Sequence, residues 1–322
     1  MSKVIAVVGA TGAQGGGLVQ AILDDPERAF TVRALTRSAQ SASAQALAAR
    51  GAEIVEADLD DESSLRKAFD GVYGAFVVTN YWVARTPAEE AARTRAEMEL
   101  QQAGNAARAA KDAGVQHLVW STLEDTRDFF GDRADVPGLD DGRYKVPHFD
   151  AKGEADEIFR STGVPTTYLR TTFYFDAFLN GLEPKRDADG KITITFPMSD
   201  QPLSGVASDD IGRTALAILK RPDLIDETIS IAGAHLTGHQ YAERLAATLG
   251  EEVTYNSPTW AEFRSYGFPM AVEMANMFQF YAENKDFAGD RDLDAVRALN
   301  PALQSFDTWL ELHKDELKAL VS

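Results

Sequence analysis

Three glycines near the N-terminus have a spacing suited to holding a phosphate group. Gly9, Gly12 and Gly15 lie between a short apolar run and a segment with helical spacing. Glycines let the chain turn sharply and bring backbone close to a ligand. A helix that begins at such a turn offers free N–H groups and a partial positive charge to an anion. The strand–turn–helix setting predicts a nucleotide site, and the polar side chains of Thr11 and Gln14 favour it over a tight turn without a ligand.

A basic residue follows the second strand-like run, where many dinucleotide-binding proteins carry an acid. An NAD-specific site usually places Asp or Glu on the ribose 2′-hydroxyl about 20 residues after the glycine turn. No acid occurs from Thr31 to Gly51, and Arg37 follows the run 31–36. Its guanidinium is a planar fork of donors that suits a 2′-phosphate. The pattern favours NADP(H) over NAD(H); the alternative is a solvated surface arginine.

Polar residues also follow two later apolar runs that have the character of buried strands. Asp58 follows the run 53–56 and could accept a hydrogen bond from an adenine amino group, or equally cap a helix or close a turn. Ligands bind at the carboxyl ends of strands in parallel sheets. Contacts to ribose or nicotinamide are therefore expected from the residues after the run 75–78, which are Thr79, Asn80, Tyr81 and Trp82.

A parallel sheet is needed to bring these residues to one edge. Strand-like runs alternate with helical segments through the first half of the chain, which predicts an α/β, Rossmann-type doubly wound parallel sheet with a smaller C-terminal α/β domain. We expect the first domain over 1–150, with its sheet completed by parts of 151–180 and 205–235. The second domain is expected mainly over 181–322. Residues 125–147 lack periodicity, which predicts a long surface loop at the rim of the active site.

Composition limits the classes of function. The 322 residues include 32 Lys and Arg against 50 Asp and Glu, for a formal charge of −18. This charge argues against direct binding to nucleic acid or an anionic membrane. The absence of cysteine excludes disulfides, thiolate metal sites and a cysteine nucleophile. No apolar stretch approaches the roughly 20 residues that span a bilayer, and no signal peptide is recognisable, so we expect a cytoplasmic protein.

The second half offers fewer chemical signals. His235 and His239 stand four residues apart, but no carboxylate stands at ligand spacing, so no metal site is expected. His117 and His313 are expected to be structural or solvated. Residues 260–281 are dense in aromatics and methionines, which could line a pocket or a partner surface, although a packed helical cap is favoured. A strand over 191–196 is expected in a small mixed sheet.

Longer motifs resemble one family over almost the full length of the chain. Together with the glycine turn, Arg37 and 79–82, they are Pro147-His148-Phe-Asp-Ala-Lys152-Gly-Glu-Ala, Gly163-Val-Pro165-Thr-Thr-Tyr-Leu-Arg170, Phe173-Tyr174-Phe175-Asp176, Gly267-Phe-Pro269, Ala275-Asn-Met-Phe278, Leu299-Asn-Pro301 and Trp309-Leu-Glu-Leu-His-Lys314. These segments resemble the NmrA-like family, an atypical branch of the short-chain dehydrogenase/reductases. The resemblance implies a Rossmann domain that binds NADP(H) and a smaller C-terminal domain that closes over the nicotinamide side.

The resemblance also implies which residues contact NADP(H). Matched motif by motif, they are Gly9, Thr11, Gly12, Ala13, Gln14, Gly15, Gly16, Arg37, Ser38, Ala39, Gln40, Ser41, Asp58, Leu59, Thr79, Asn80, Tyr81, Gln101, Lys152, Tyr174, Phe175, Asp176 and Ala177. The chain departs from the family pattern at two of these positions. Ala177 replaces an asparagine, and Gln101 replaces a lysine of the long helix.

The catalytic set implied by the resemblance is incomplete. Working short-chain reductases use Tyr-x-x-x-Lys, in which the tyrosine transfers a proton and the lysine lowers its pKa and binds the ribose. Here His148 stands at the tyrosine position, four residues before Lys152, and Ser121 at the position of the serine that orients the substrate. A histidine can act as a general acid near neutral pH, so the replacement weakens the expectation of catalysis without removing it.

Three functions follow from these observations. The first is a redox (NADPH/NADP+) sensor or regulator with weak or no dehydrogenase activity, which acts through a regulatory protein partner or a homodimer. The alternative is an NADPH-dependent oxidoreductase that reduces a quinone or carbonyl substrate. The third, a scaffold with a vestigial glycine turn, predicts no affinity for nucleotides.

Overall fold

The computed structural model describes residues 3–187 and 189–322, and the chain divides into two compact units. The first unit comprises Met1–Asp125, Pro147–Thr171 and Asp209–Ser230. The second comprises Thr126–Val146, Thr172–Ser208 and Ile231–Ser322. Among the described residues, no helix is long and apolar enough to cross a membrane.

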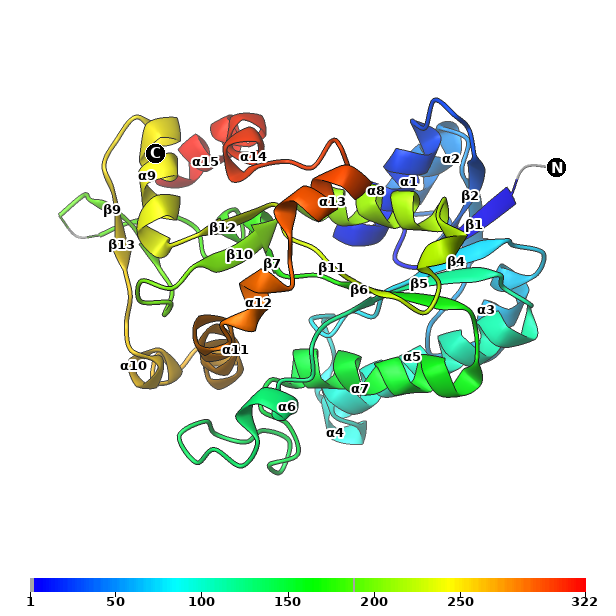
Figure 1. The fold of residues 1–322 in the computed structure, drawn as a ribbon, viewed down its shortest axis with the longest axis horizontal. Coiled ribbons are helices and arrows are strands. Elements are labelled where there is room, and N and C mark those ends of the chain that lie inside the picture. The colour runs from blue at the N-terminus through cyan, green and yellow to red at the C-terminus, as the bar shows by residue number, and fades with distance from the viewer. Residues whose placement is uncertain (1–2, 188) are drawn as a thin grey trace. The chain divides into compact units, whose positions relative to one another are not determined.

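A seven-stranded parallel sheet forms the centre of the first unit (Figure 1). The strand order is β11-β6-β5-β4-β1-β2-β3. It runs outward from β1 in both directions, so the switch point at which ligands bind lies between β1 and β4. This order confirms the predicted Rossmann-type sheet. The strands are β1 (Lys3–Val7), β2 (Phe30–Thr36), β3 (Glu53–Glu56), β4 (Gly74–Val77), β5 (His117–Thr122), β6 (Thr166–Arg170) and β11 (Thr228–Ser230).

Helices cover this sheet, and three of them lie side by side: α3 (Glu62–Phe69), α5 (Arg95–Asp112) and α7 (Pro147–Thr162) (Figure 1). The face of α5 that packs here is rich in alanine, so α7 can approach it closely. The same core cluster contains the large rings of Trp120 and Phe159, which stack at 4.7 Å. The other helical segments of the unit are α1 (Ala13–Leu23), α2 (Ala42–Ala49), α4 (Pro87–Ala92), α8 (Ser208–Leu219) and the short 3₁₀ turn η2 (Pro222–Leu224).

The alanine-rich composition from Glu89 to Ala113 suggests one long helix, but the structure divides this stretch into α4 and α5. Arg93 leaves the helical conformation, and Thr94 caps the new helix. The Thr94 side chain accepts a hydrogen bond from the Glu97 N–H, and the Glu97 carboxylate accepts one from the Thr94 N–H. This reciprocal capping box starts a helix inside what looks like one alanine-rich segment.

Two three-stranded sheets and several short helices make up the second unit. The sheet β13-β9-β8 is mixed, since β9 pairs parallel to β13 and antiparallel to β8, which confirms that prediction. The other sheet has the order β12-β10-β7. The strands are β7 (Phe173–Tyr174), β8 (Lys185–Arg186), β9 (Ile192–Thr195), β10 (Leu203–Val206), β12 (Ala234–Leu236) and β13 (Val253–Asn256). The helices are α6 (Arg127–Phe130), η1 (Phe175–Phe178), α9 (Gly238–Leu249), α10 (Trp260–Arg264), α11 (Ala271–Glu283), α12 (Asp286–Gly289), α13 (Leu293–Leu299), α14 (Phe306–Leu312) and α15 (Lys314–Val321).

Aromatic packing dominates the interior of this unit. In the aromatic-rich stretch 260–281, Phe263, Phe278 and Phe280 are buried, as expected for a packed cap, whereas Tyr266 and Phe268 are exposed.

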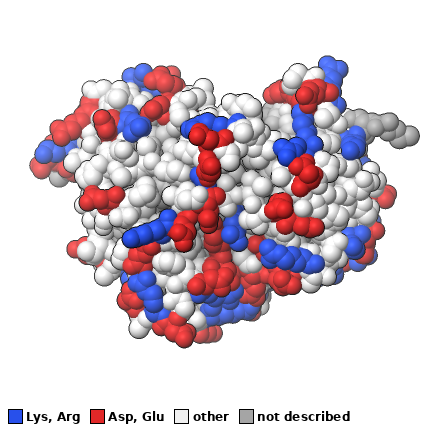
Figure 2. All heavy atoms as spheres, viewed as in Figure 1, with Lys and Arg blue, Asp and Glu red and all other residues white. Residues whose placement is uncertain are grey.

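On the face of the molecule in view in Figure 2, Lys and Arg lie interspersed with the more numerous Asp and Glu.

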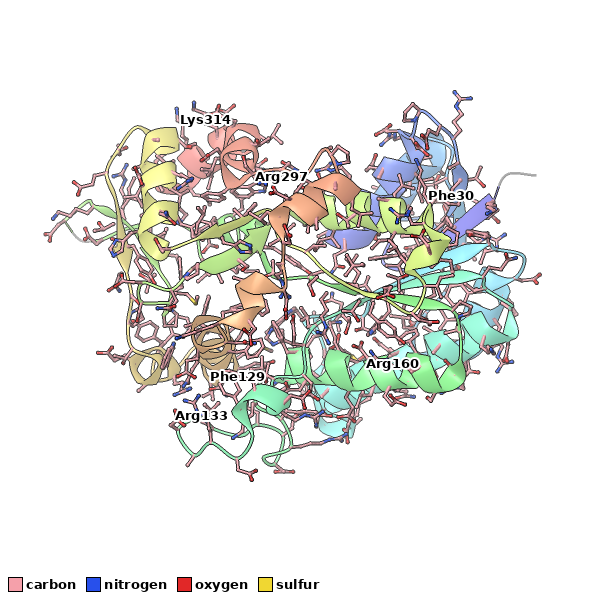
Figure 3. All side chains as sticks on the ribbon, viewed as in Figure 1. Phe30, Phe129, Arg133, Arg160, Arg297 and Lys314 are labelled. Carbon is pink, nitrogen blue, oxygen red and sulfur yellow. The ribbon has the colours of Figure 1, made fainter. Side chains whose placement is uncertain are left out.

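The segment 126–146 belongs to the second unit, and it is mostly exposed and irregular apart from α6, as predicted for a surface loop, but α11 anchors it. Arg133, labelled in Figure 3, lies 2.5 Å from the Glu283 carboxylate of α11. The Asn276 side chain of α11 donates hydrogen bonds to the carbonyls of Pro137 and Lys145 at 2.9 and 2.7 Å. The segment also buries four apolar or aromatic side chains, Phe130, Val136, Tyr144 and Val146. The sequence pattern does not reveal these contacts, because the partners on α11 are distant in the chain.

Candidate functional site

The glycine turn at the end of β1 adopts a form that favours glycine. Gly9 has a φ of +67°, in the left-handed region. A Cβ at Gly15 would lie only 2.4 Å from the Gly9 carbonyl oxygen, so Gly15 lets α1 begin directly against the turn. Helix α1, all of whose residues are described, starts after Gly12 with neither a side-chain cap nor an acid in its first turn. Its N-terminal N–H groups and positive field therefore suit a pyrophosphate.

Gln14 links this turn to the end of β5. The Ser121 hydroxyl donates a hydrogen bond to the Gln14 side-chain oxygen at 2.6 Å. Ser121 was the candidate for orienting a substrate. Because its proton is directed at Gln14, the hydroxyl can offer a ligand only its lone pairs in this arrangement.

The loop after β2 carries the predicted 2′-phosphate site. Ser41 caps α2 by accepting a hydrogen bond from the Ala44 N–H, and its own hydroxyl donates to the Ser38 carbonyl at 3.0 Å. The Gln45 amide donates to the Ala39 carbonyl at 2.7 Å. Arg37 is exposed, and within the part of the chain that the structure describes no ion pair engages its guanidinium. The loop is thus shaped by its own hydrogen bonds and presents a free cation.

The residues after β3 form a tight turn that is tied to α5. The Asp58 carboxylate accepts from the Asp60 N–H at 2.9 Å, which confirms the turn role that the sequence left open beside adenine binding. The Leu59 carbonyl accepts from the Asn105 amide at 2.8 Å. Gln101 is exposed on α5, where its side-chain oxygen accepts a hydrogen bond from Arg93.

Lys152 is the centre of a buried cluster of polar side chains at the end of β4. Its ammonium donates to the Thr79 carbonyl at 3.0 Å, to the Thr79 hydroxyl at 2.6 Å and to the Glu99 carboxylate at 2.8 Å. The Thr79 hydroxyl donates in turn to the same Glu99 oxygen at 2.6 Å. Lys152 is 8% exposed and Glu99 1%, and the second oxygen of Glu99 is buried without a hydrogen-bond partner among the described residues. The ammonium is therefore fixed in place before any ligand arrives.

Glu99 is the member of this group that sequence reasoning missed. The family pattern directed attention to Gln101, two residues further along α5. The available signal was an acid on the same side of the helix as Ala103, Ala106 and Ala110, since a buried carboxylate needs a partner.

His148 is buried among aromatic rings. It is 6% exposed, and its ring lies 4.9 Å from that of Trp82 and 5.7 Å from that of Tyr81. Asn80 shapes the same turn by accepting from the Trp82 N–H at 3.0 Å. His148 and Lys152 both come from the first turns of α7, as the spacing of four residues requires.

Two buried titratable groups contact strand β5, Asp156 near its end and His117 as its first residue. Asp156 accepts hydrogen bonds from the Trp120 indole at 2.9 Å and the Thr122 hydroxyl at 2.7 Å, and burial raises its pKa to about 6. His117 on β5 is fully buried, and burial lowers its pKa to about 4. Its Nε2 lies 2.8 Å from the Thr167 hydroxyl, whose proton is donated to the Leu224 carbonyl, so Nε2 carries the ring proton. His117 is thus structural, as expected.

The family follows from comparison with known proteins. The chain matches the NmrA-like family over residues 1–311. It belongs to the NmrA-like family. One relative, the NmrA-like family domain-containing oxidoreductase ptmS of Penicillium ochrochloron, is 30% identical over 305 residues, which cover 88% of this chain and 84% of that protein. The oxidoreductase himF of Aspergillus japonicus is 35% identical over 205 residues, which cover 61% of this chain but only 56% of himF.

Solved structures share the fold of this NmrA-like chain. NmrA, a negative transcriptional regulator in complex with NAD, superposes with a TM-score of 0.75 at 21% identity, over 99% of this chain and 97% of NmrA. The Citrobacter triphenylmethane reductase complexed with NADP(H) gives 0.73 at 21% identity, over 97% and 99% of the two chains. The Escherichia coli quinone oxidoreductase QOR2 complexed with NADPH gives 0.71 at 22% identity, over 96% and 99%. At these identities the likeness establishes the fold alone.

Four of the family's expected dinucleotide contacts lie in the second unit. Phe175 is fully buried, with its ring centroid 5.0 Å from that of Phe306. Asp176 accepts hydrogen bonds from the Ser208 N–H at 3.1 Å and hydroxyl at 3.0 Å, which fixes the start of α8. Tyr174 and Ala177 are half-buried. Contact of these residues with a dinucleotide stays a prediction.

The two histidines that stand four residues apart, His235 and His239, make contacts with other side chains and backbone. His235 places Nδ1 2.8 Å from the Ser204 hydroxyl and Nε2 3.0 Å from the Arg291 carbonyl. His239 is exposed, with its ring beside Tyr255. Over residues 3–187 and 189–322, no group of three or more His, Asp or Glu side chains is arranged to hold a metal ion.

Proposed function

We propose that this NmrA-like protein binds NADP(H) at the carboxyl ends of β1, β2 and β4. The glycine cradle at the start of α1 suits the pyrophosphate, and the unpaired Arg37 guanidinium suits the 2′-phosphate. Lys152 lies at the end of β4 with all three of its N–H donors engaged, so a ribose hydroxyl that binds it would replace one of the bonds to Thr79 or Glu99. The triphenylmethane reductase complexed with NADP(H) and QOR2 complexed with NADPH support the same ligand class.

We infer that its role is to sense or regulate according to the NADPH/NADP+ state, with weak or no dehydrogenase activity. The observation that carries this inference is the buried His148 at the tyrosine position, packed against the rings of Trp82 and Tyr81. Bound NADPH supplies a hydride, but a carbonyl acceptor also needs a proton donor at its oxygen. Lys152 is committed to Thr79 and Glu99, and the Ser121 proton to Gln14. We place the sensor in the cytoplasm, acting through a regulatory protein partner or a homodimer.

A second candidate is an NADPH-dependent reductase of quinones or other acceptors that take up hydride without a protein proton donor. The names of ptmS and himF as oxidoreductases favour it, as does the quinone oxidoreductase activity named for QOR2. A quinone can take its protons from water after hydride transfer, so the replacement of tyrosine by His148 does not count against this chemistry. It counts against reduction of simple ketones and aldehydes.

The test follows loss of nicotinamide absorbance after the NADPH-loaded protein meets a panel of quinones, aldehydes and ketones. A sensor shows saturable NADPH binding without turnover, and it is cleaved differently by protease when loaded with NADPH or NADP+, because a ligand shifts a conformational equilibrium only through differential affinity. Rapid oxidation by quinones alone, lost in Lys152→Ala, selects the reductase. Equal affinities and identical proteolysis with the two ligands rule out the sensor.

A further inference from the structure

Glu56, the last residue of β3, lies against the loop that is proposed to hold the 2′-phosphate. Strands β2 and β3 pair in parallel with Thr36 opposite Glu56, so both strands end at the same edge of the sheet. The Glu56 carboxylate accepts a hydrogen bond from the Ala39 N–H at 2.9 Å. The segment 31–51 contains no acid, but the neighbouring strand delivers one to the same loop.

The loop does not depend on Glu56 alone for its shape. The Ser38 N–H is held by the Thr36 hydroxyl at 3.2 Å, and the Ala39 carbonyl by the Gln45 amide at 2.7 Å. The loop should therefore keep its shape when the charge of Glu56 is removed, because these other hydrogen bonds remain.

Two opposite charges at this loop are left without ion-pair partners. Among the residues that the structure describes, no ion pair joins Glu56 to a cation or Arg37 to a carboxylate. A 2′-phosphate is attracted by Arg37 and repelled by Glu56, and Glu56 also occupies the Ala39 N–H that a phosphate oxygen could use. The unphosphorylated ribose of NAD(H) is instead favoured by Glu56, because its 2′-hydroxyl can donate a hydrogen bond to the carboxylate.

We propose that Glu56 is a specificity-determining residue that lowers the preference of this protein for NADP(H) over NAD(H). The proposal rests on the proposed dinucleotide site. For a carboxylate and a phosphate with nearly two charges, a separation of about 5 Å in water gives a repulsion that corresponds to about a tenfold change in the affinity ratio.

The test compares dissociation constants for NADP+ and NAD+ by isothermal titration calorimetry in the parent protein, Glu56→Gln and Glu53→Gln. Glutamine keeps an oxygen that can accept from the Ala39 N–H, so the first variant removes the charge and preserves the loop. Glu53 stands at the other end of β3, where it pairs with Arg33, so its variant makes the same change of charge away from the loop. A Glu56→Ala variant, which also frees the Ala39 N–H, provides a second measurement.

We expect Glu56→Gln and Glu56→Ala to raise the preference for NADP+ over NAD+ by about tenfold, with no change in Glu53→Gln. Added salt should shrink the gain, because ions screen exposed charges. If both dinucleotides bind and the ratio in both Glu56 variants stays within about twofold of the parent value, Glu56 does not set the preference, while the proposed site stands. If neither dinucleotide binds the parent protein, the proposed site itself is wrong, and the inference falls with it.

Discussion

The Lys152 ammonium lies 2.8 Å from the Glu99 carboxylate, and both side chains are almost completely buried. The pair joins α7 to α5 and is completed by the Thr79 hydroxyl. A lysine held by a carboxylate, a hydroxyl and a carbonyl keeps its position without a ligand. All three N–H donors of the ammonium are thus engaged, and a ribose hydroxyl would have to replace one of these partners.

The coupling between these two residues should be measurable in stability. Lys152→Met leaves a buried carboxylate without its cation, and Glu99→Gln leaves the ammonium without its anion, so each change should lower the free energy of unfolding by about 3–5 kcal/mol. The double variant should lose less than the sum, by about 1–3 kcal/mol. Urea titration of the four proteins gives the cycle, and additive losses would show that the pair contributes no mutual stabilisation.

The close approach of α1 to the glycine turn predicts a second effect. Gly15→Ala puts a methyl group 2.4 Å from the Gly9 carbonyl oxygen, so backbone must shift, with a loss of about 1–3 kcal/mol in stability and loss of NADPH affinity. Gly289→Ala on α12 is the matched control, because its methyl group meets no atom within 4 Å. Calorimetry and thermal unfolding should separate the two variants. Equal NADPH affinity in Gly15→Ala and the parent would place the dinucleotide elsewhere.

Two buried groups, His117 and Asp156, make contributions to the free energy of unfolding that change in opposite directions with pH. The folded-state pKa of His117 falls from 6.5 to about 4, so its contribution is present above pH 6.5 and is lost as the pH drops toward 4. The folded-state pKa of Asp156 rises from 3.8 to about 6, so its contribution is present below pH 3.8 and is lost as the pH rises through 6. Each shift corresponds to about 3 kcal/mol, and the two largely cancel.

Single variants should reveal the two contributions. Relative to the parent, Asp156→Asn should gain stability from pH 4 to pH 7, by up to about 3 kcal/mol, because the neutral amide avoids burying a charge and its oxygen can still accept from Trp120 and Thr122. His117→Gln should show the opposite trend relative to the parent over the same range. Urea unfolding at several pH values checks both slopes. Parallel curves for parent and variants would mean that neither group is shifted.

The segment 126–146 should be protected as long as α11 holds it. Asn276→Leu leaves the partly buried Pro137 and Lys145 carbonyls without their donor and removes an acceptor of Arg264, and each lost bond costs at most about 1–3 kcal/mol. We expect faster proteolysis within 126–146 and a lower melting temperature. Gln116→Leu, at an exposed position whose side chain makes no hydrogen bond among the described residues, serves as the control for an amide-to-leucine change. Unchanged cleavage in Asn276→Leu would show that the segment is secured by its buried side chains alone.

The sequence predicted the sheet well because its strands are short apolar runs between turns. β3 occupies 53–56 as expected, and β2 differs from its expected start by one residue. The glycine turn, Arg37 and Lys152 could be found because motif and chemistry coincide in a local stretch.

The missed features depend on contacts between distant parts of the chain. Glu99 meets Lys152 across 53 positions, and Glu56 reaches the Ala39 loop through the register of two strands. The anchoring of 126–146 depends on hydrogen bonds to α11. Of these, only Glu99 leaves a trace in the sequence, as an acid on the alanine-rich face of α5. The break at Thr94 also left one, a Thr-x-x-Glu capping box, which the alanine-rich composition around it obscured.

The most direct test of this account is a calorimetric titration of the purified protein with NADPH, repeated with Gly15→Ala and Gly289→Ala. We expect saturable binding of one NADPH per chain in the parent and in Gly289→Ala, and none in Gly15→Ala. The absence of saturable binding to the parent, or equal binding to all three proteins, would contradict the proposal that the glycine turn holds a nicotinamide dinucleotide.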